Sequence, residues 1–184
     1  MTTAQQLKIS VGDYLAGELI SDIKHEYING EVFAMAGAKR THNLIAGNIF
    51  AALHNHLRGT PCQVFNSDMK VGVLTATDDI FYYPDVQVSC EKNGNDHYNA
   101  EPKLIVEVLS DSTERKDRVE KFYTYRKLAS LEEYVLVAQD CLRVEIYRRR
   151  NGWDLELLGE GQRFQLESVE LPLTVADVYQ DVEF

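Results

Sequence analysis

Apolar and polar positions alternate along the N-terminal third of the chain in ways that predict two helices and a hairpin. A short helix is predicted over residues 10–19, opened by a serine in a capping position. Two strands at 25–28 and 31–35 flank Asn29-Gly30, a dipeptide typical of tight hairpin loops because both residues tolerate a positive φ. Apolar residues then recur at helical spacing over about 40–58, which predicts a second helix.

The rest of the chain is richer in strand-like segments. Strands are predicted at 63–66, 69–74, 82–89, 103–109, 133–138, 143–149 and 153–158, with helices at 113–128 and 173–179. Residues 104–109 read Leu-Ile-Val-Glu-Val-Leu, which is apolar on both faces except for Glu107 and therefore indicates a central buried strand. This order favours the α/β class, more narrowly an α+β mixed β-sheet flanked by helices, in a single domain over 1–184.

Length and composition are those of a globular chain that can bury one sizeable core. The chain has 184 residues, and 45% of them are apolar. It contains no apolar run of about 18 residues, so we expect no membrane span. The three cysteines are odd in number and far apart, which argues against a disulfide framework or a cysteine-type zinc site and favours a cytoplasmic protein.

The net charge of −10 argues against a nucleic-acid partner, because proteins that bind phosphate backbones usually carry a basic surface. The charge is unevenly distributed, however. Residues 151–184 hold eight acids and one base, whereas residues 115–127 hold six bases and 148–150 are three arginines. These basic stretches suit either a phosphate contact or an ordinary solvated surface.

Two carboxylates carry the chemistry that the sequence suggests. A buried ionised carboxylate such as Glu107 is costly unless it is paired or bound to a cation, so a buried ion pair is one explanation and a metal site another. Asp85 follows Pro84 at the start of a predicted strand, where it is either a turn former or a second ligand. If neighbouring strands bring Asp85 and Glu107 together, two hard oxygen ligands suit Mg²⁺ better than zinc.

The ordered set of motifs resembles the PD-(D/E)XK nuclease superfamily. Pro84-Asp85, a spacer of 21 residues and Glu107-Val108-Leu109 are similar to its metal-binding core. The matching stretches are similar to those of one bacterial branch described as restriction endonucleases; they are Tyr27–Glu31, His42-Asn43, Tyr83–Val86, Leu104–Ser110, Asp117–Lys121, Tyr125-Arg126 and Tyr134–Val137. The resemblance implies a restriction-endonuclease-like core, Mg²⁺ or Mn²⁺ held by Asp85 and Glu107, and hydrolysis of nucleic-acid phosphodiester bonds, with DNA as the substrate.

One position departs from that pattern. The superfamily has a lysine two residues after the acid, and this chain has Leu109 there. In this branch the resemblance implies that the lysine has moved to the following helix, where Lys121 is the candidate and Asp117 lies four residues earlier on the same face. An exposed Asp117–Lys121 surface pair is the alternative. Lys70, in the sequence Asp68-Met69-Lys70, precedes Asp85 and ranks behind Lys121, with Asp68 as a possible accessory acid.

His42, at the start of the second predicted helix, is the fourth candidate catalytic residue. The resemblance places it near the site, where it would accept a proton, bind a metal or contact phosphate, although a histidine at a helix start is often only a polar cap. A binding module that keeps this fold without catalysis and a phosphoesterase acting on small nucleotides remain rival hypotheses. Apolar strands in the C-terminal half leave an edge that favours a homodimer.

Overall fold

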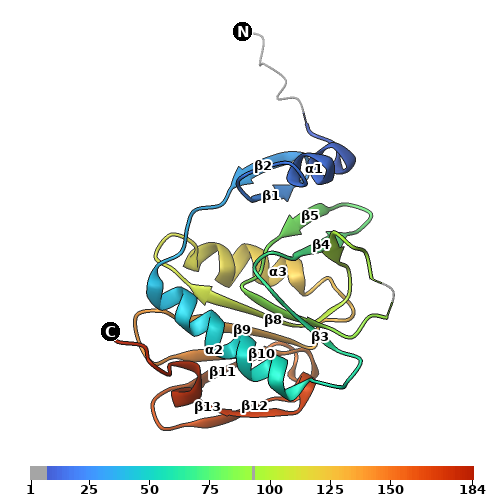
Figure 1. Ribbon diagram of the computed structural model, residues 1–184. Helices are drawn as coiled ribbons and strands as arrows, with labels where there is room; N and C mark the ends of the chain where they lie inside the picture. Colours follow the sequence, from blue (N-terminus) through green and yellow to red (C-terminus); the bar gives the residue numbers. More distant parts are fainter. Residues whose placement is uncertain (1–7, 93) are drawn as a thin grey trace.

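Three β-sheets and the helices packed against them make up the fold seen in a computed structural model that describes residues 8–92 and 94–184 (Figure 1). The strands are β1 (His25–Ile28), β2 (Glu31–Ala34), β3 (Gln63–Asn66), β4 (Lys70–Leu74), β5 (Asp79–Tyr82), β6 (Val86–Ser89), β7 (Tyr98–Asn99), β8 (Pro102–Leu109), β9 (Glu133–Ala138), β10 (Val144–Arg148), β11 (Leu155–Leu158), β12 (Arg163–Leu166) and β13 (Leu171–Thr174). The helical elements are α1 (Val11–Glu18), α2 (Arg40–His56), η1 (Lys116–Lys121), α3 (Phe122–Tyr125), η2 (Arg149–Asn151), η3 (Glu167–Val169) and α4 (Val175–Val178). Among the described residues, no helix is both long and apolar enough to cross a membrane.

A six-stranded mixed sheet with the order β11-β10-β9-β8-β6-β3 forms the centre of the molecule. Strands β8 and β9 run parallel and the other neighbours antiparallel, which confirms the mixed sheet that the sequence predicts. Alternate residues of β8 face opposite layers: Leu104, Val106 and Val108 pack with α2, whereas Ile105 and Leu109 pack with Tyr125 of α3. Glu107 lies between Ile105 and Leu109 on the same face of β8 and therefore faces η1 and α3.

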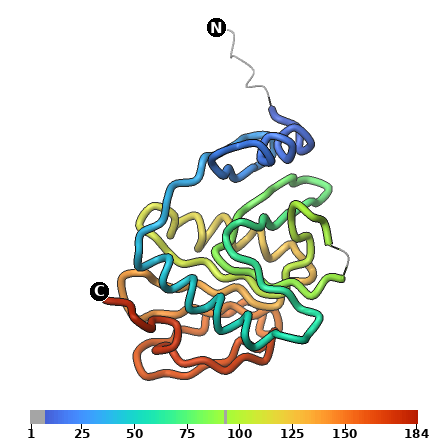
Figure 2. Tube along the Cα trace, in the orientation of Figure 1, coloured from blue at the N-terminus to red at the C-terminus, as the bar shows by residue number. Residues whose placement is uncertain are grey.

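A five-stranded sheet, ordered β2-β1-β5-β4-β7, carries the N-terminal part of the chain. The predicted hairpin is present: Asn29 and Gly30 join β1 to β2 with φ of 50° and 99°. Helix α1 covers this sheet through Tyr14, whose ring stacks on Tyr27 and packs at a tilt against Phe81. The trace in Figure 2 runs from this region at one end of the molecule to the β12–β13 hairpin at the opposite end.

Three predicted elements differ from the observed ones. The predicted strand 82–89 is two strands, because Tyr83-Pro84-Asp85 interrupts it and sends β5 and β6 into different sheets; proline has no backbone N–H to donate to a sheet. The predicted helix 113–128 is shorter, and its first part, η1, is a π-helical turn. The predicted tail helix 173–179 is strand β13 followed by α4, which is capped by Thr174 and Asp177.

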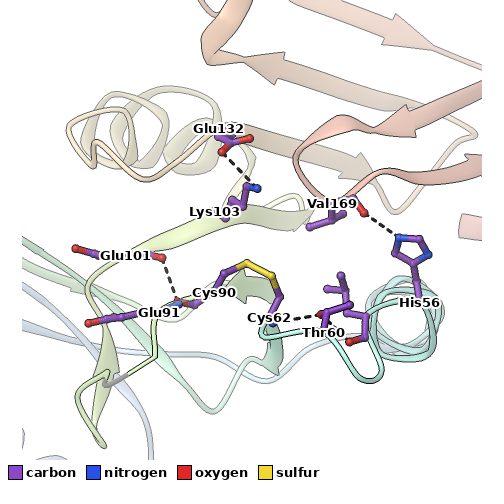
Figure 3. The surroundings of a disulfide bond; sticks show 11 residues. His56, Thr60, Cys62, Cys90, Glu91, Glu101, Lys103, Glu132 and Val169 are labelled. Atoms are coloured by element: carbon purple, nitrogen blue, oxygen red, sulfur yellow. Dashed lines mark hydrogen bonds and ion pairs between the residues drawn. A yellow bond between two sulfur atoms is a disulfide. The ribbon is translucent and has the colours of Figure 1, made fainter.

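The sequence argument against a disulfide framework missed one bond, because Cys62 and Cys90 are joined by a disulfide (Figure 3). Cys62 precedes β3 and Cys90 follows β6, and these strands pair antiparallel with Gln63 opposite Ser89. The two cysteines are thus the next opposed pair, with their Cα atoms 4.0 Å apart. Sequence spacing could not show this, because it depends on strand register. A cytoplasmic location stays a prediction, and a disulfide is uncommon in that compartment.

Candidate metal and phosphodiester site

The register of β6 and β8 brings the two predicted carboxylates together. Asp85 lies one residue before β6, and Val86 pairs with Val106 of β8. Because antiparallel partners run in opposite directions, the next opposed pair is Asp85 and Glu107. The backbone N–H of Val108 donates to Asp85 Oδ2 at 2.7 Å, and this hydrogen bond fixes the Asp85 side chain against β8 just before β6 begins.

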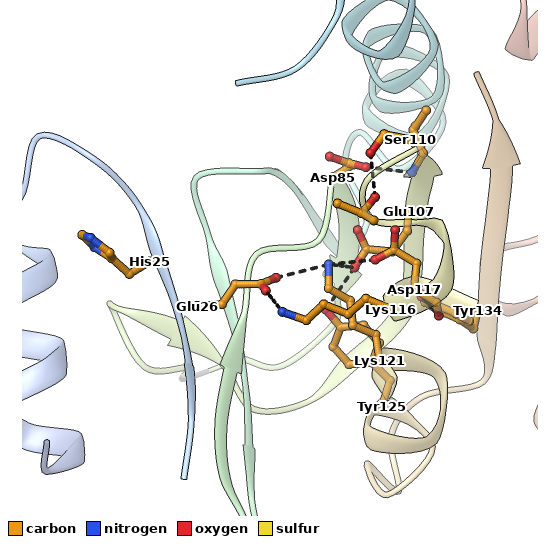
Figure 4. Close-up of polar contacts among 12 residues, drawn as sticks. His25, Glu26, Asp85, Glu107, Ser110, Lys116, Asp117, Lys121, Tyr125 and Tyr134 are labelled. Carbon is orange, nitrogen blue, oxygen red and sulfur yellow. Dashed lines mark hydrogen bonds and ion pairs between the residues drawn. The ribbon is translucent and has the colours of Figure 1, made fainter. Parts of the chain in front are cut away.

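Glu107 is buried among groups that hydrogen-bond to one of its oxygens (Figure 4). It is 3% exposed, and its Oε1 accepts hydrogen bonds from Lys121 Nζ at 3.0 Å and from the Tyr125 hydroxyl at 3.2 Å. Leu109, at the position where the resemblance expects a lysine, is buried in the apolar cluster beside it. Lys121 of the following helical segment therefore supplies a cation at Glu107 that Leu109 cannot.

Lys121 and Asp117 share the inward side of the π-helical turn η1. The Lys121 ammonium lies 3.1 Å from Asp117 Oδ1, and both residues are buried. The exposed surface pair considered for Asp117 and Lys121 is therefore wrong. π-Helical turns are rare and often occur at functional sites, where the extra residue in the turn redirects side chains.

Glu26 and Lys116 are members of this cluster that the sequence did not single out. Glu26 comes from β1 of the other sheet, is 6% exposed, and has its Oε1 3.3 Å from Lys121 Nζ. Lys116 forms an ion pair with the same carboxylate and packs over the rings of Phe33 and Tyr82. The only available signal was that Glu26 directly precedes the matched stretch Tyr27–Glu31.

His42 approaches the site from the first turn of α2. Its Nε2 lies 2.9 Å from Asp85 Oδ1, so that the two oxygens of Asp85 face His42 and the Val108 N–H. Both side chains are about one-sixth exposed, at 14% for His42 and 16% for Asp85. This edge of the cluster is thus partly open to solvent, unlike the enclosed Glu107.

Burial and crowding shape the ionisation of the cluster. Burial raises the pKa of Glu107 well above its usual value; the Lys121 charge opposes this shift, and Asp117 and Asp85 add to it. Burial alone would lower the pKa of Lys121, but the carboxylates of Glu107, Asp117 and Glu26 outweigh it and raise that pKa. Lys121 therefore keeps its proton, and Glu107 takes up a proton more readily than an ordinary carboxyl group.

The donor set fits one divalent cation of the Mg²⁺ type. Four carboxylates (Glu26, Asp85, Glu107, Asp117) face two ammonium groups (Lys116, Lys121), an excess of two negative charges when all are ionised. Among the residues that the structure describes, buried Asp117 Oδ1 has no hydrogen-bonding partner apart from the Lys121 ammonium 3.1 Å away. Within residues 8–92 and 94–184, no three His, Cys, Asp or Glu side chains converge on one metal position. Mg²⁺ commonly uses only one or two carboxylates and completes its coordination with water and phosphate, so Asp85 and Glu107 suffice.

The other residues weighed from the sequence lie elsewhere. Lys70 is buried but bonds the Tyr83 hydroxyl at 3.1 Å, on the α1 side of the five-stranded sheet. Asp68 is exposed and pairs with Lys24 at 2.5 Å. Neither contacts Asp85 or Glu107, so the structure gives them no part in this cluster.

Comparisons of the sequence and of the fold with known proteins identify related chains. A family model described as "Uma2: Putative restriction endonuclease" matches residues 11–178. Two uncharacterized proteins of Synechocystis sp., slr1290 and sll1609, are each 32% identical to the chain, over 96% and 93% of it and over 94% and 99% of their own lengths. A crystal structure from Anabaena variabilis, described as a "putative nuclease belonging to DUF820", superposes with a TM-score of 0.71 over 86% of this chain and 91% of its own, at 16% identity. That likeness confirms the nuclease-like fold.

Proposed function

The chain belongs to the Uma2 family, described as "Putative restriction endonuclease", and on that premise we propose that it is a Mg²⁺- or Mn²⁺-dependent endonuclease that hydrolyses DNA phosphodiester bonds. The observation that carries the proposal is the convergence of Asp85 and Glu107 from paired strands, with the Lys121 ammonium 3.0 Å from Glu107. A bound divalent cation would supply Lewis-acid polarisation of the phosphate and a more acidic water. Asp85 and Glu107 would hold that cation, with the backbone carbonyl of Val108 as a further candidate ligand.

The chain's own residues would perform the remaining tasks. Lys121 would orient the attacking water or offset the negative charge that builds on the phosphate, as fixed cations do in phosphoryl transfer. His42 would fix the orientation of Asp85 through their 2.9 Å contact. Tyr125 and Tyr134, fully buried at 0%, exclude water from the inner side of the cluster.

A plasmid cleavage assay tests this function. The wild type is expected to nick or linearise supercoiled DNA in Mg²⁺ or Mn²⁺ and to stop in EDTA, whereas Asp85→Asn and Glu107→Gln should be at least about 100-fold slower. Asp79→Asn, an exposed aspartate on β5, is the matched control and should retain full activity. Equal activity in wild type and Asp85→Asn would show that a contaminant or another site is responsible.

A binding module without catalysis is the second candidate. Leu109 in place of the lysine and the net charge of −10 favour it. DNA binding by the wild type with no cleavage in either metal, unchanged in Lys121→Gln, would support that candidate. Turnover of mononucleotides faster than of long DNA would instead identify a small-molecule phosphoesterase.

We also propose that two copies associate through β11. This strand pairs only with β10 within the described chain, and its Leu155 and Leu157 are 53% and 57% exposed. Edge strands usually carry lysine, proline or bulges that discourage pairing, and the sequence Leu-Glu-Leu-Leu of β11 has none of them. Light scattering should find a dimer for the wild type and a monomer for Leu157→Lys; a monomeric wild type would refute this part.

A further inference from the structure

The Lys121 ammonium has three carboxylate neighbours from three different parts of the fold. Glu107 of β8 lies at 3.0 Å, Asp117 of the same helical turn at 3.1 Å, and Glu26 of β1 at 3.3 Å. Figure 4 shows Glu26 reaching the lysine from the side opposite Glu107 and Asp117. The ammonium is thus held between the two sheets and not by its own helix alone.

Glu107 serves both the lysine and the proposed metal. A divalent cation on Glu107 and an ammonium group on the same carboxylate repel each other, because like charges in a poorly solvated site are weakly screened. Lys121 therefore competes with the metal for Glu107 unless another anion holds it. Asp117 is an incomplete answer, because its carboxylate lies beside that of Glu107, on the same side of the ammonium (Figure 4).

Glu26 is the neighbour that acts on Lys121 without crowding the metal ligands. Its carboxylate pairs with Lys121 at 3.3 Å and with Lys116, and Figure 4 shows it on the side of the Lys121 ammonium away from Glu107. Its backbone is held in β1, where Glu26 pairs with Phe33 of β2 and the next two residues pair with β5. Lys116 forms a second ion pair with its carboxylate.

We propose that Glu26 is a positioning residue that draws the Lys121 ammonium off Glu107 when a divalent cation binds there. Glu26 thereby lets one carboxylate, Glu107, serve the metal while the lysine stays in the site beside the phosphate. The N-terminal hairpin is then part of the reactive centre, although it supplies no metal ligand. The inference deepens the proposed function and shares its metal site.

A double-mutant cycle on metal affinity tests this role without using cleavage. Affinity for Mn²⁺ is measured from the electron paramagnetic resonance signal of the free ion in wild type, Glu26→Gln, Lys121→Gln and the double variant. Removing a group that supports a metal ligand typically costs 10–100-fold in affinity, so Glu26→Gln should weaken Mn²⁺ binding by about tenfold or more. Lys121→Gln should bind Mn²⁺ at least as tightly as the wild type, because the competing ammonium is gone.

The coupling between Glu26→Gln and Lys121→Gln shows whether Glu26 affects Mn²⁺ affinity through Lys121. In the Lys121→Gln background, Glu26→Gln should change the affinity by about threefold at most, because contacting residues are not additive when one acts through the other. Glu31→Gln removes the same charge from an exposed position of the same hairpin and should change the affinity by less than about twofold. Glu26→Asp, which keeps the charge on a shorter side chain, should restore part of the loss.

Several outcomes would overturn the role. An equal fold-change for Glu26→Gln in both backgrounds, or an equal effect of Glu31→Gln, would mean that Glu26 acts only as a distant charge. No Mn²⁺ binding by the wild type would remove the competition on which the role depends. If the cycle behaves as expected and the wild type cleaves no nucleic acid, the nuclease function fails and the role of Glu26 stands.

Folding is controlled separately. Circular dichroism confirms that each variant is folded at the assay temperature. If Glu26→Gln unfolds because two lysines lose their partner, the variant Glu26→Gln with Lys116→Met restores the charge balance and takes its place in the cycle. The same coupling with Lys121 is expected there, and additive effects would again overturn the role.

Discussion

Replacing Lys121 by methionine is the perturbation whose stability effect the cluster determines most directly. Methionine keeps the length and apolar body of the side chain and removes its charge. Three buried carboxylates then lose a cation that lay 3.0 to 3.3 Å away. The matched control is Lys127→Met; the Lys127 ammonium lies 2.9 Å from Asp78, but the Lys127 side chain is 43% exposed.

The magnitudes follow from burial and not from distance. At an effective dielectric constant of about 20, a pair at 3 Å attracts by about 5 kcal/mol before desolvation is subtracted. Breaking a buried pair typically costs about 3–5 kcal/mol, because the charge left behind has no partner. The exposed Lys127–Asp78 pair is screened by water, so its loss should cost about 0.2–1 kcal/mol. The two pairs have similar distances, but the loss of unfolding free energy should be several-fold larger for Lys121→Met than for Lys127→Met.

Urea unfolding followed by circular dichroism in EDTA measures both variants. A divalent cation stabilises the state that binds it, so Mn²⁺ should stabilise the wild type and both variants. It should narrow the stability gap to the wild type for Lys121→Met, which has lost the competing ammonium, and leave the gap of Lys127→Met unchanged. If Lys121→Met loses no more stability than Lys127→Met, the ammonium does not compensate the buried carboxylates, and the electrostatic account of the cluster is wrong.

Two further predictions concern the frame around the site. Gly30→Ala should lower the free energy of unfolding by roughly 1–3 kcal/mol, because φ is +99° there and a Cβ would lie 2.7 Å from Lys8 Cβ. Gly17→Ala in α1 meets nothing within 4 Å and should raise it by up to about 1 kcal/mol. Thermal denaturation measures both. Cys62→Ser should lose about 3.5 kcal/mol under oxidising conditions, because Cys90 lies 28 positions after Cys62 in the chain. A reductant should then lower wild-type stability to the same level, and an unchanged wild type would contradict this.

Local patterns predicted much of the fold because they follow from single elements. The hairpin follows from Asn29-Gly30, whose backbone angles suit a two-residue loop. The apolar run around Glu107 predicted a buried strand, and β8 is the central strand between β6 and β9. The sequence predicted one strand over 82–89, because a single proline at position 84 does not show that the segments before and after it join different sheets.

Long-range pairings account for what the sequence did not reveal. The Cys62–Cys90 bond depends on the register of β3 against β6, which no local pattern specifies. Glu26 looks like the polar half of an ordinary alternating strand, and its contact with Lys121 exists only because a second sheet packs there. The resemblance made Lys121 a candidate and placed Asp117 on the same helix face, while the burial of both beside Glu107 needed the three-dimensional arrangement.

The single-turnover rate of plasmid cleavage at saturating Mn²⁺, compared between wild type and Lys121→Gln, tests the central claim most directly. Saturating metal removes any difference in metal affinity, so the rate reports what the lysine does at the phosphate. The account predicts metal-dependent cleavage by the wild type and a rate at least about 100-fold lower for Lys121→Gln, as for other positioned cations or proton donors. Equal rates, or no cleavage by the wild type in Mn²⁺, would contradict it.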